Sequence, residues 1–372
     1  MVMDHHRLCS LYDNWFSEGK WTHSQVVREC VSKDLYQASA KIYGYSVYAQ
    51  RISTGVKMCG NSTQQYSWKP NGCRLRSVDP VNFARLLAGR RVLIVGDSTS
   101  MLMYVALACE LSSEIDAEAS EPARAALWAS GVLHVLGRAP GAPGPKTPVG
   151  LGTAFAVSGG GSVEMLPTDL LVSADGNVSH AAWQRQYKML DGTGQVRLQA
   201  GWATRVESAA AHDILILNSG LHFSWRNNLR QTKFEYHDVL RRVFGWLSSH
   251  FAGRIVYRDT YMGVQRCHGY VPGRLTAPAR SCCDYGDAEE LNGLVREVVD
   301  ELGLRDRVWF LRVGPMSQER CDRRDAVHFC VPGPVNEWVR ALYNWLILTG
   351  WRRHIERANG TGRRGTYSSV RL

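Results

Sequence analysis

The sequence contains no CxxC pair, although it has ten cysteines. This absence argues against a zinc ribbon and against a thioredoxin-like redox motif. The chain also has no glycine-rich nucleotide-binding motif that opens a helix with the required acidic partner, and no basic helix with interleaved aromatic residues. We therefore expect no nucleic-acid partner, no metal site and no tightly bound cofactor.

The first twenty residues, Met1 to Lys20, contain no apolar run, so neither a signal peptide nor a membrane anchor is visible there. The cysteines are instead spread over the whole chain, which predicts long-range disulfides and an oxidising compartment. Sequons at Asn61, Asn177 and Asn359 agree with a glycoprotein. The alternatives are a cytosolic protein with free thiols or a missing N-terminal targeting segment. We favour the second, with the Golgi lumen or secretory pathway as the location and membrane contact only through that segment.

The composition is that of a globular protein, with 45% hydrophobic and 21% charged residues. Half of the net charge of +10 lies at one end, because the segment from Arg352 onward holds six arginines and one glutamate. A basic surface attracts acidic polysaccharide, anionic lipid or nucleic acid. Because the charge is so local, we expect residues 352–372 to form a solvated, disordered tail.

The apolar run Val92–Val95 lacks alternation, which is typical of a parallel strand buried on both faces. Similar runs recur along the chain and alternate with segments of helical periodicity, so we predict an α/β fold with a mainly parallel sheet. The Gly-, Pro- and Ala-rich segment 137–163 is expected to be an insertion or a long surface loop. The expected strands are 92–95, 213–218, 254–258 and 308–313, and the expected helices are 101–111, 234–251, 287–302 and 334–348.

The first chemically informative segment is Gly96-Asp97-Ser98, which follows a predicted strand and precedes a predicted helix. Functional groups collect at the carboxyl ends of parallel strands. A helix N-terminus favours negative charge, which suits Ser98 as a nucleophile and its backbone N–H as a donor to an oxyanion. Gly96 allows the tight turn, and Asp97 is suited to cap the helix. A capping serine in an ordinary turn is the alternative.

A serine hydroxyl is a weak nucleophile and needs a base. Asp325-Ala326-Val327-His328 offers one, just before the last predicted helix. A carboxylate three residues ahead of a histidine can bind its Nδ1–H and leave Nε2 facing serine. The combination predicts a catalytic triad of Ser98, His328 and Asp325.

The predicted strand 213–218 ends in a third polar segment, Asn218-Ser219-Gly220. Asn218 is a candidate side-chain donor and Gly220 a candidate backbone donor to the oxyanion. A simple strand-ending turn is the alternative. His222 and Trp225 follow, and we expect them to line the cleft, where tryptophan can stack on sugar rings.

Five segments together carry a family pattern: Cys9–Tyr12 with Trp15, Trp68–Leu75, Leu87–Ser98, Asp213–Gly220, and Asp325–Gly333 with Trp338. In this order they resemble the PC-esterase family of GDSL/SGNH-like acyl-esterases, which includes the trichome-birefringence-like polysaccharide O-acetyltransferases. The middle of the chain, 112–200, carries almost none of this resemblance. Met101 stands where the family usually has arginine, and Ala326 stands where it has cysteine.

The resemblance implies an SGNH-like three-layer α/β/α sandwich with a mainly parallel sheet over residues 78–351, with a variable insertion at about 112–200. It also implies a loop-rich, disulfide-stapled N-terminal lobe over residues 1–77. The implied disulfides are Cys9–Cys73, Cys30–Cys109 and Cys59–Cys330. The four remaining cysteines allow three connectivities, and they are Cys267, Cys282, Cys283 and Cys321.

The implied reaction is transfer of an acetyl group to Ser98 and then to a hydroxyl of a polysaccharide or oligosaccharide acceptor, such as one of the cell wall. Acetyl-CoA or another acetyl donor would be the co-substrate. A carbohydrate acetyl-esterase of the same fold is the first alternative, because transfer and hydrolysis use the same triad. A non-catalytic polysaccharide-binding protein is the second, and Met101 is the main argument for it.

Overall fold

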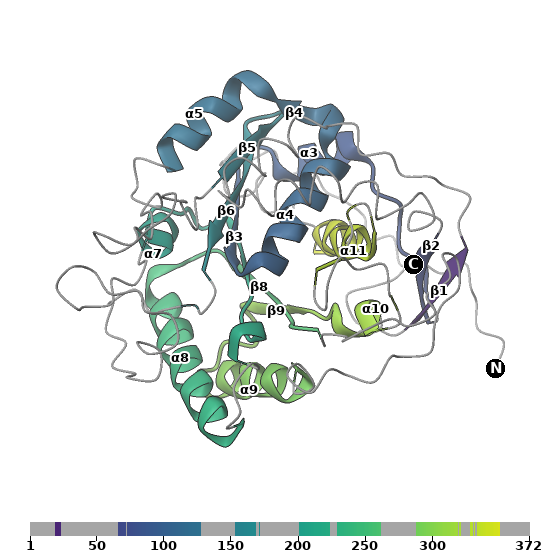
Figure 1. Ribbon diagram of the computed structural model, residues 1–372. Coiled ribbons are helices and arrows are strands. Elements are labelled where there is room, and N and C mark those ends of the chain that lie inside the picture. Colours follow the sequence, from purple (N-terminus) through teal and green to yellow (C-terminus); the bar gives the residue numbers. More distant parts are fainter. Residues whose placement is uncertain are drawn as a thin grey trace, which may run out of the picture.

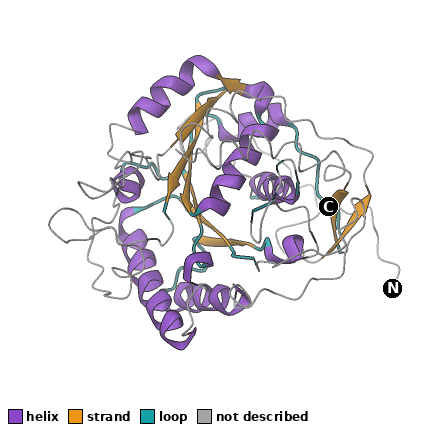
Figure 2. Ribbon diagram, in the orientation of Figure 1, coloured by secondary structure: helices purple, strands orange, loops and turns teal. Residues whose placement is uncertain are grey.

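The structure is a computed structural model, and the helices and strands it describes form layers around one sheet (Figures 1 and 2). Helices cover both faces of that sheet, and a small two-stranded sheet lies at one side of the molecule. The described residues are 19–23, 66–71, 73–127, 153–168, 171, 201–223, 229–261, 288–318, 320, 328–329, 331 and 333–349.

The main sheet has seven strands, and its central strand β3 leads into the Gly96-Asp97-Ser98 turn. Strands β6, β3, β7, β8 and β9 run parallel to one another, whereas β5 pairs antiparallel with both β4 and β6 at one edge. This arrangement confirms the predicted α/β class with a mainly parallel sheet. In spatial order the strands are β4 (Ile115–Asp116), β5 (Thr153–Val157), β6 (Gly161–Pro167), β3 (Arg91–Gly96), β7 (Ile214–Leu217), β8 (Arg254–Arg258) and β9 (Val308–Leu311).

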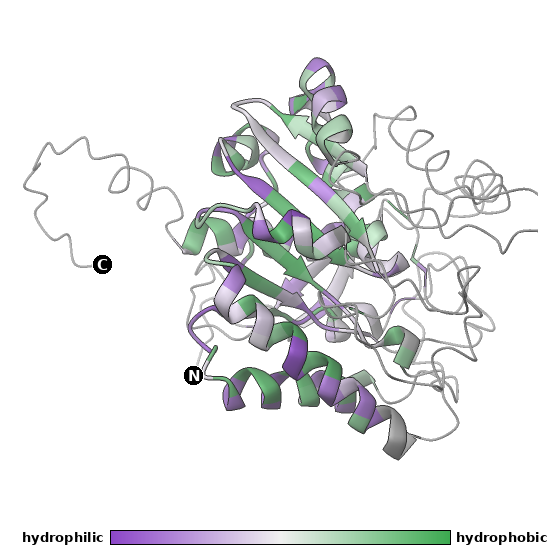
Figure 3. Ribbon diagram, turned by 90° about the vertical axis from the view of Figure 1, so that its left-hand side faces the viewer, coloured by the Kyte–Doolittle hydropathy of each residue, from purple (hydrophilic) through white to green (hydrophobic). Residues whose placement is uncertain are grey.

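Alternate residues of the buried strands supply two separate cores. In β3, Val92 and Ile94 belong to the core beneath α3 (Pro80–Leu87), α4 (Ser98–Glu110) and α11 (Pro334–Leu348). Leu93 and Val95 belong to the opposite core, beneath α7 (Gly201–Glu207), α8 (Leu229–His250) and α9 (Ala288–Glu301). Figure 3 shows hydrophobic strands at the centre, with helices around them that change between hydrophobic and hydrophilic stretches. The predicted three-layer α/β/α sandwich is therefore confirmed.

Two of the helices that pack on the face of α4 begin with sequence signals that explain where they start. At α3, the Asp79 side chain accepts a hydrogen bond from Asn82 N (3.1 Å) and Pro80 occupies the first turn. At α11, Pro334 occupies the first turn. Among the helices that the structure describes, none combines the length and the apolar character needed to cross a bilayer.

In the N-terminal region the structure describes the antiparallel pair β1 (Gly19–His23) and β2 (Tyr66–Pro70). Trp21 and Trp68 meet edge to face with ring centroids 5.5 Å apart, and Trp21 Nε1 donates to Met316 O of α10 (Gly314–Gln318) at 3.2 Å. Arg340 of α11 donates to Ser67 Oγ (2.9 Å). The two-stranded sheet is thus held against α10 and α11.

The predicted strands and helices are confirmed, with ends shifted by a few residues. The predicted loop 137–163 is wrong at its C-terminal end, where β5 and the start of β6 form a hairpin. Gly159 and Gly160, with φ of 86° and 78°, allow the tight reversal between these strands. The glycines thus mark a turn between two apolar strands. The variable middle of the chain also contains η3 (Ser112–Glu114) and α5 (Ala117–Leu127).

Cys73 and Cys109 are both disulfide-bonded. Their predicted partners, Cys9 and Cys30, lie outside the described residues, as do Cys59 and Cys330. The three implied pairings therefore stay predictions. The same holds for the proposed domain limits and for the basic tail at 352–372, which also lies outside the described residues.

Candidate active site

The structure brings Ser98 and His328 together from positions 230 residues apart. His328 Nε2 lies 2.8 Å from Ser98 Oγ. Ser98 is the half-buried first residue of α4, directly after central strand β3, and His328 is buried ahead of α11. A nucleophile and a base within hydrogen-bond distance form the core of a serine-dependent site. Asp325, the predicted third member of the triad, lies outside the described residues.

Helices α4 and α11 are joined close to the point where the chain leaves His328. Asn336 Nδ2 donates to Glu110 Oε1 (2.8 Å), and Asn336 Oδ1 accepts from Gly333 N (2.9 Å). These bonds fix the start of the helix that follows the histidine segment to the end of the helix that begins with Ser98. The two halves of the site are therefore held by neighbouring helices.

An aromatic cluster of Tyr261, Phe329 and Trp338 packs beside the histidine. The ring centroids of Tyr261 lie 5.2 Å from Phe329 and 5.3 Å from Trp338, and Phe329 meets Trp338 edge to face at 6.0 Å. Because Phe329 is the chain neighbour of His328 and is almost fully buried, the cluster restricts where the imidazole can lie.

Gly96 is required by the close approach of the turn to its neighbours. A Cβ there would clash with Ser100 Oγ and lie 2.9 Å from Asn218 O. Asp97 caps α4, since its Oδ1 accepts from Thr99 N (2.8 Å) and from Thr99 Oγ1 (2.6 Å). The Asp97 side chain is fully buried, so it supports the turn that carries Ser98 from beneath.

The first turn of α4 leaves one backbone donor for the predicted oxyanion. The N–H groups of Thr99, Ser100 and Met101 bind Asp97. The N–H of Ser98 makes no hydrogen bond within the described part of the chain. It is therefore a candidate donor to charge that develops on a carbonyl attacked by Ser98. Met101 is half-buried and packs against the hydrophobic core on this face of the sheet.

The side chain of Asn218 does not fit the oxyanion role predicted for it. Asn218 Nδ2 donates to Arg258 O (2.8 Å) and to Thr260 Oγ1 (3.2 Å), so both amide hydrogens are used inside the protein. Its role is to join the ends of β7 and β8. The sequence pattern located the strand end correctly but could not show which way the amide faces.

Gly220 is buried and has a φ of 128°, which favours glycine. A Cβ there would also lie 2.9 Å from Thr260 Oγ1. Its predicted backbone contact to an oxyanion stays a prediction. His222 lies in the short helix η5 (Leu221–Phe223), where its side chain is not described, and Trp225 lies outside the described residues.

The end of β7 is clamped by buried hydroxyl groups. Tyr257 Oη donates to Ser219 O at 2.8 Å, Thr260 Oγ1 donates to it at 2.7 Å, and Tyr236 Oη lies 3.0 Å from the same oxygen. Burial raises the pKa of both tyrosines, so they remain neutral. These contacts give the carboxyl edge of the sheet a rigid floor near the turn.

The sequence interpretation missed two ionisable residues at the end of β8. The Arg258 side chain is fully buried, and its Nη2 donates to Thr99 Oγ1 (2.6 Å) and Ser100 Oγ (3.2 Å). Asp259 Oδ1 accepts from Val313 N (2.5 Å) and Gly314 N (3.2 Å), and burial raises the pKa of this carboxyl to about 7. The sequence could have indicated them, because both lie at the carboxyl end of a predicted parallel strand, where functional groups collect.

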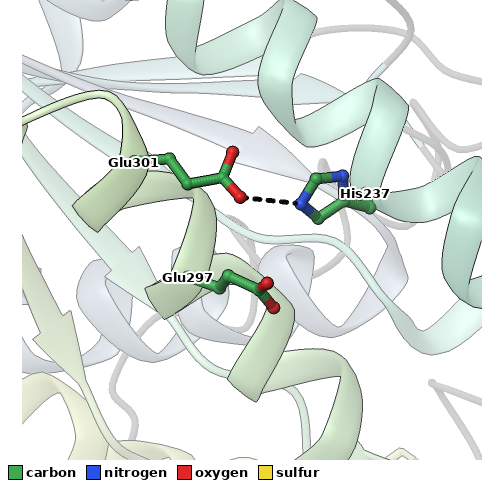
Figure 4. Close-up of side chains that lie close together, drawn as sticks. All are labelled: His237, Glu297 and Glu301. Carbon is green, nitrogen blue, oxygen red and sulfur yellow. Dashed lines mark ion pairs between the residues drawn. The ribbon is translucent and has the colours of Figure 1, made fainter.

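A separate group of ionisable residues lies between α8 and α9 (Figure 4). The ligand atoms of His237, Glu297 and Glu301 lie within 4.8 Å of one another. His237 Nε2 and Arg241 Nε each lie 3.5 Å from a Glu301 oxygen. Two basic side chains of α8 thus face two acidic side chains of α9, so interhelical ion pairing accounts for the group. It lies on the sheet face opposite α4.

No family model matches this chain. Trichome birefringence-like 40 of Arabidopsis thaliana is 38% identical over 52 residues, which is 14% of this chain and 14% of that protein. Xyloglucan O-acetyltransferase 3 of Populus trichocarpa is 40% identical over 50 residues, which is 13% of each chain. The chain thus matches only about a seventh of the length of these curated relatives. Within these segments, the matches confirm the resemblance to the PC-esterase family and its trichome-birefringence-like members.

Est24, a carbohydrate acetylesterase from Sinorhizobium meliloti, is a similar solved structure. It is 13% identical, with a TM-score of 0.34 over 70% of this chain and 99% of that chain. A likeness at this level carries no argument about activity or about individual residues.

Proposed function

We propose that this protein is a serine-dependent O-acetyltransferase that acetylates polysaccharide hydroxyls through an acetyl-Ser98 intermediate. The observation that carries the proposal is the distance of 2.8 Å between Ser98 Oγ and His328 Nε2 at the carboxyl end of the central strand. The sequence matches to trichome birefringence-like proteins and to a xyloglucan O-acetyltransferase support the choice of an acetyl group and a polysaccharide. Asp325 would complete the triad by holding the histidine tautomer.

In the first half-reaction, Ser98 Oγ attacks the acetyl carbonyl of the donor while its proton passes to His328 Nε2. Negative charge develops on the carbonyl oxygen next to the N-terminus of α4, where the Ser98 N–H and the helix dipole favour it. The bond to the leaving group then breaks, and the leaving group takes the proton from His328. The product of this half-reaction is acetyl-Ser98.

In the second half-reaction, a sugar hydroxyl gives its proton to His328 Nε2 and attacks the acetyl carbonyl. Ser98 Oγ leaves and recovers that proton, so the enzyme returns to its starting state. If water takes the place of the sugar hydroxyl, the same steps release acetate, and the protein is a carbohydrate acetyl-esterase. Transfer therefore depends on whether an acceptor sugar reaches acetyl-Ser98 before water does.

The proposal includes acetyl-CoA or another acetyl donor as co-substrate and a polysaccharide or oligosaccharide as acceptor. It places the protein in the Golgi lumen or secretory pathway, where its disulfides would persist. The disulfide-bonded state of Cys73 and Cys109 supports an oxidising compartment. No tightly bound cofactor is part of the proposed reaction.

Transfer and hydrolysis can be separated with p-nitrophenyl acetate as the donor and xyloglucan oligosaccharides as the acceptor. We expect release of p-nitrophenol together with an acetylated oligosaccharide, and neither product with the Ser98→Ala variant. If acetate is released at the same rate with and without sugar, the acetyl-esterase alternative replaces the transferase.

Labelling by a fluorophosphonate probe separates both enzymes from a binding protein. We expect the wild-type protein to be labelled on Ser98 and the folded Ser98→Ala variant to remain unlabelled. A wild-type protein that resists the probe under conditions that label a known serine esterase would favour the non-catalytic polysaccharide-binding alternative.

A further inference from the structure

We infer that Arg258 is a positioning residue for the nucleophile: it offsets the buried charge of Asp97 and holds the turn on which Ser98 lies. The inference rests on the proposed function, because it concerns the reactivity of Ser98. Arg258 itself is fully buried and does not reach substrate. It acts from beneath the site, through residues that surround the nucleophile.

The contacts of Arg258 converge on the turn directly after Ser98. Its Nη2 donates to Thr99 Oγ1 (2.6 Å) and to Ser100 Oγ (3.2 Å), so one nitrogen holds two consecutive side chains of the first turn of α4. Its Nη1 donates to Asp259 O (3.1 Å). The backbone of Arg258 is held in turn, because its carbonyl accepts from Asn218 Nδ2 (2.8 Å).

Arg258 and Asp97 form a charge pair whose link runs through a hydroxyl. Arg258 Nη2 donates to Thr99 Oγ1, and Thr99 Oγ1 donates to Asp97 Oδ1 (2.6 Å). Arg258 Nη2 and Asp97 Oδ1 are 4.0 Å apart, and neither side chain is exposed to solvent. At this distance in a buried environment the two charges interact strongly. The Thr99 hydroxyl therefore fixes the distance between the Arg258 guanidinium and the Asp97 carboxylate.

The charges of this pair bear directly on the proposed reaction. Asp97 precedes the nucleophile, and a lone carboxylate there would oppose negative charge on a carbonyl oxygen at the N-terminus of α4. A lone guanidinium would also be unfavourable at a helix N-terminus. Together the two groups leave the turn close to neutral, so the Ser98 N–H and the helix dipole can stabilise the oxyanion without a competing charge.

Arg258 also contacts the side of the site that carries the base. Its guanidinium carbon lies 5.2 Å from the centroid of the Trp338 ring, within cation–π range. Trp338 packs against Phe329, the chain neighbour of His328. One buried side chain thus contacts the turn of the nucleophile and the aromatic cluster that supports the histidine.

A charge-compensation cycle tests the inference, with the rate constant of inactivation (kinact) and the binding constant (KI) of a fluorophosphonate probe as readouts. We expect Arg258→Met to lower kinact about 10²-fold with KI unchanged, because a displaced or charge-perturbed nucleophile slows bond formation without weakening binding. Arg258→Lys should restore part of kinact. Asp97→Asn keeps a capping acceptor, so the double variant Arg258→Met/Asp97→Asn should react about tenfold faster than Arg258→Met alone.

The pair Arg205 and Glu164 provides a matched control, because it is a partly buried arginine–carboxylate pair whose hydrogen bonds do not involve the nucleophile turn. Arg205→Met should lower the melting temperature but leave kinact of the folded protein unchanged. If Arg258→Met behaves like this control, or if the double variant is no faster than Arg258→Met, Arg258 has only a structural role and the inference is wrong.

Thr99→Val keeps the test decisive if Arg258→Met does not fold. This variant leaves both charges in place and removes only the hydroxyl between them. We expect kinact to fall about tenfold, which matches the loss of a hydrogen bond to a charged group. A folded Thr99→Val variant that reacts at the wild-type rate would overturn the inference, whereas a wild-type protein that does not react at all would overturn the proposed function itself.

Discussion

Two arginine–carboxylate pairs in this protein are built in different ways, one partly buried and one fully buried. Arg205 Nε and Nη2 donate to the two oxygens of Glu164 at 2.6 Å and 2.7 Å, which is the bidentate geometry of a strong ion pair. Arg258 and Asp97 are more deeply buried, yet they are 4.0 Å apart and linked through Thr99. Asp97 Oδ2 and Arg258 Nε have no hydrogen-bond partner in the described part of the chain.

The difference shows what each pair does for the protein. In a bidentate pair, both carboxylate oxygens accept hydrogen bonds from the guanidinium, so each charge is compensated. The pair of Glu164 and Arg205 therefore joins β6 to α7. Unpaired buried polar atoms are costly and rare, and they concentrate where function constrains the side chains. Two such atoms, Asp97 Oδ2 and Arg258 Nε, lie beneath the turn that carries Ser98, which agrees with the positioning role inferred for Arg258.

The largest change in labelling rate is expected when the proposed base, His328, is replaced. Replacement of His328 by alanine removes the group that receives the serine proton, so we predict a fall in the fluorophosphonate labelling rate of at least about 10³-fold. His212→Ala is the matched control, because this histidine is 56% exposed and should label like wild type. Equal labelling of the His328→Ala variant would mean that Ser98 does not depend on a base at this position.

A variant of the bidentate pair should show the opposite pattern. Glu164→Ala leaves Arg205 without its carboxylate, and we expect a loss of about 3 kcal/mol in the free energy of unfolding. The folded protein should still be labelled at the wild-type rate. Urea denaturation and probe labelling of the same sample measure the two quantities, and a large loss of labelling without a loss of stability would contradict the division between the two pairs.

Asp259 is a buried carboxyl group that, unlike Glu164, has no bidentate arginine partner among the residues that the structure describes. Burial raises its pKa from 3.8 to about 7, so the folded state holds a proton that the unfolded state releases between these values. Stability conferred by this proton is complete below pH 4 and is lost as the pH rises through 7, by roughly 4 kcal/mol. Asp259→Asn should be less sensitive to pH than wild type over this window. Parallel stability curves, measured by denaturation from pH 4 to pH 8, would contradict the assignment.

The smallest loss of stability is expected at Gly220, at the floor of the site. Gly220 has a φ of 128°, and an added Cβ would lie 2.9 Å from Thr260 Oγ1. We predict that Gly220→Ala lowers the free energy of unfolding by about 1–3 kcal/mol through backbone strain. Gly303→Ala is the control, because its φ is 65° but nothing lies within 4 Å of the added Cβ. A larger loss at Gly303 would show that contact with Thr260 is not what sets the cost.

Much of the fold could be predicted because the buried strands are continuous apolar runs. Val92–Val95 and the apolar centre of Arg254–Arg258 are recognisable as strands from the sequence alone. The alternation of strands and helices then predicts the α/β class and the end of the sheet at which Ser98 lies. The hairpin of β5 and β6 was missed because its apolar strands flank a run of glycines that is also typical of a loop.

The contact between Ser98 and His328 could be predicted, but the buried contacts beneath it could not. Ser98 and His328 lie in short motifs, Gly-Asp-Ser and Asp-x-x-His, whose residue types are typical of a nucleophile and a base. Arg258 and Asn218 depend on side-chain direction across three neighbouring segments, β3, β7 and β8, and no local pattern encodes that. Their contacts follow from the parallel register of the strands, which only the folded chain reveals.

The central claim is that Ser98 carries the acetyl group during the reaction. Brief mixing of the protein with p-nitrophenyl acetate, acid quenching and peptide mass spectrometry would locate the group directly. We predict one acetyl group on the peptide that contains Ser98 in the wild-type protein, a trapped and longer-lived acetyl group when the acceptor sugar is left out, and none on Ser98→Ala. Acetylation that persists in the Ser98→Ala variant, or release of product with no acetyl-Ser98 at any mixing time, would contradict the account.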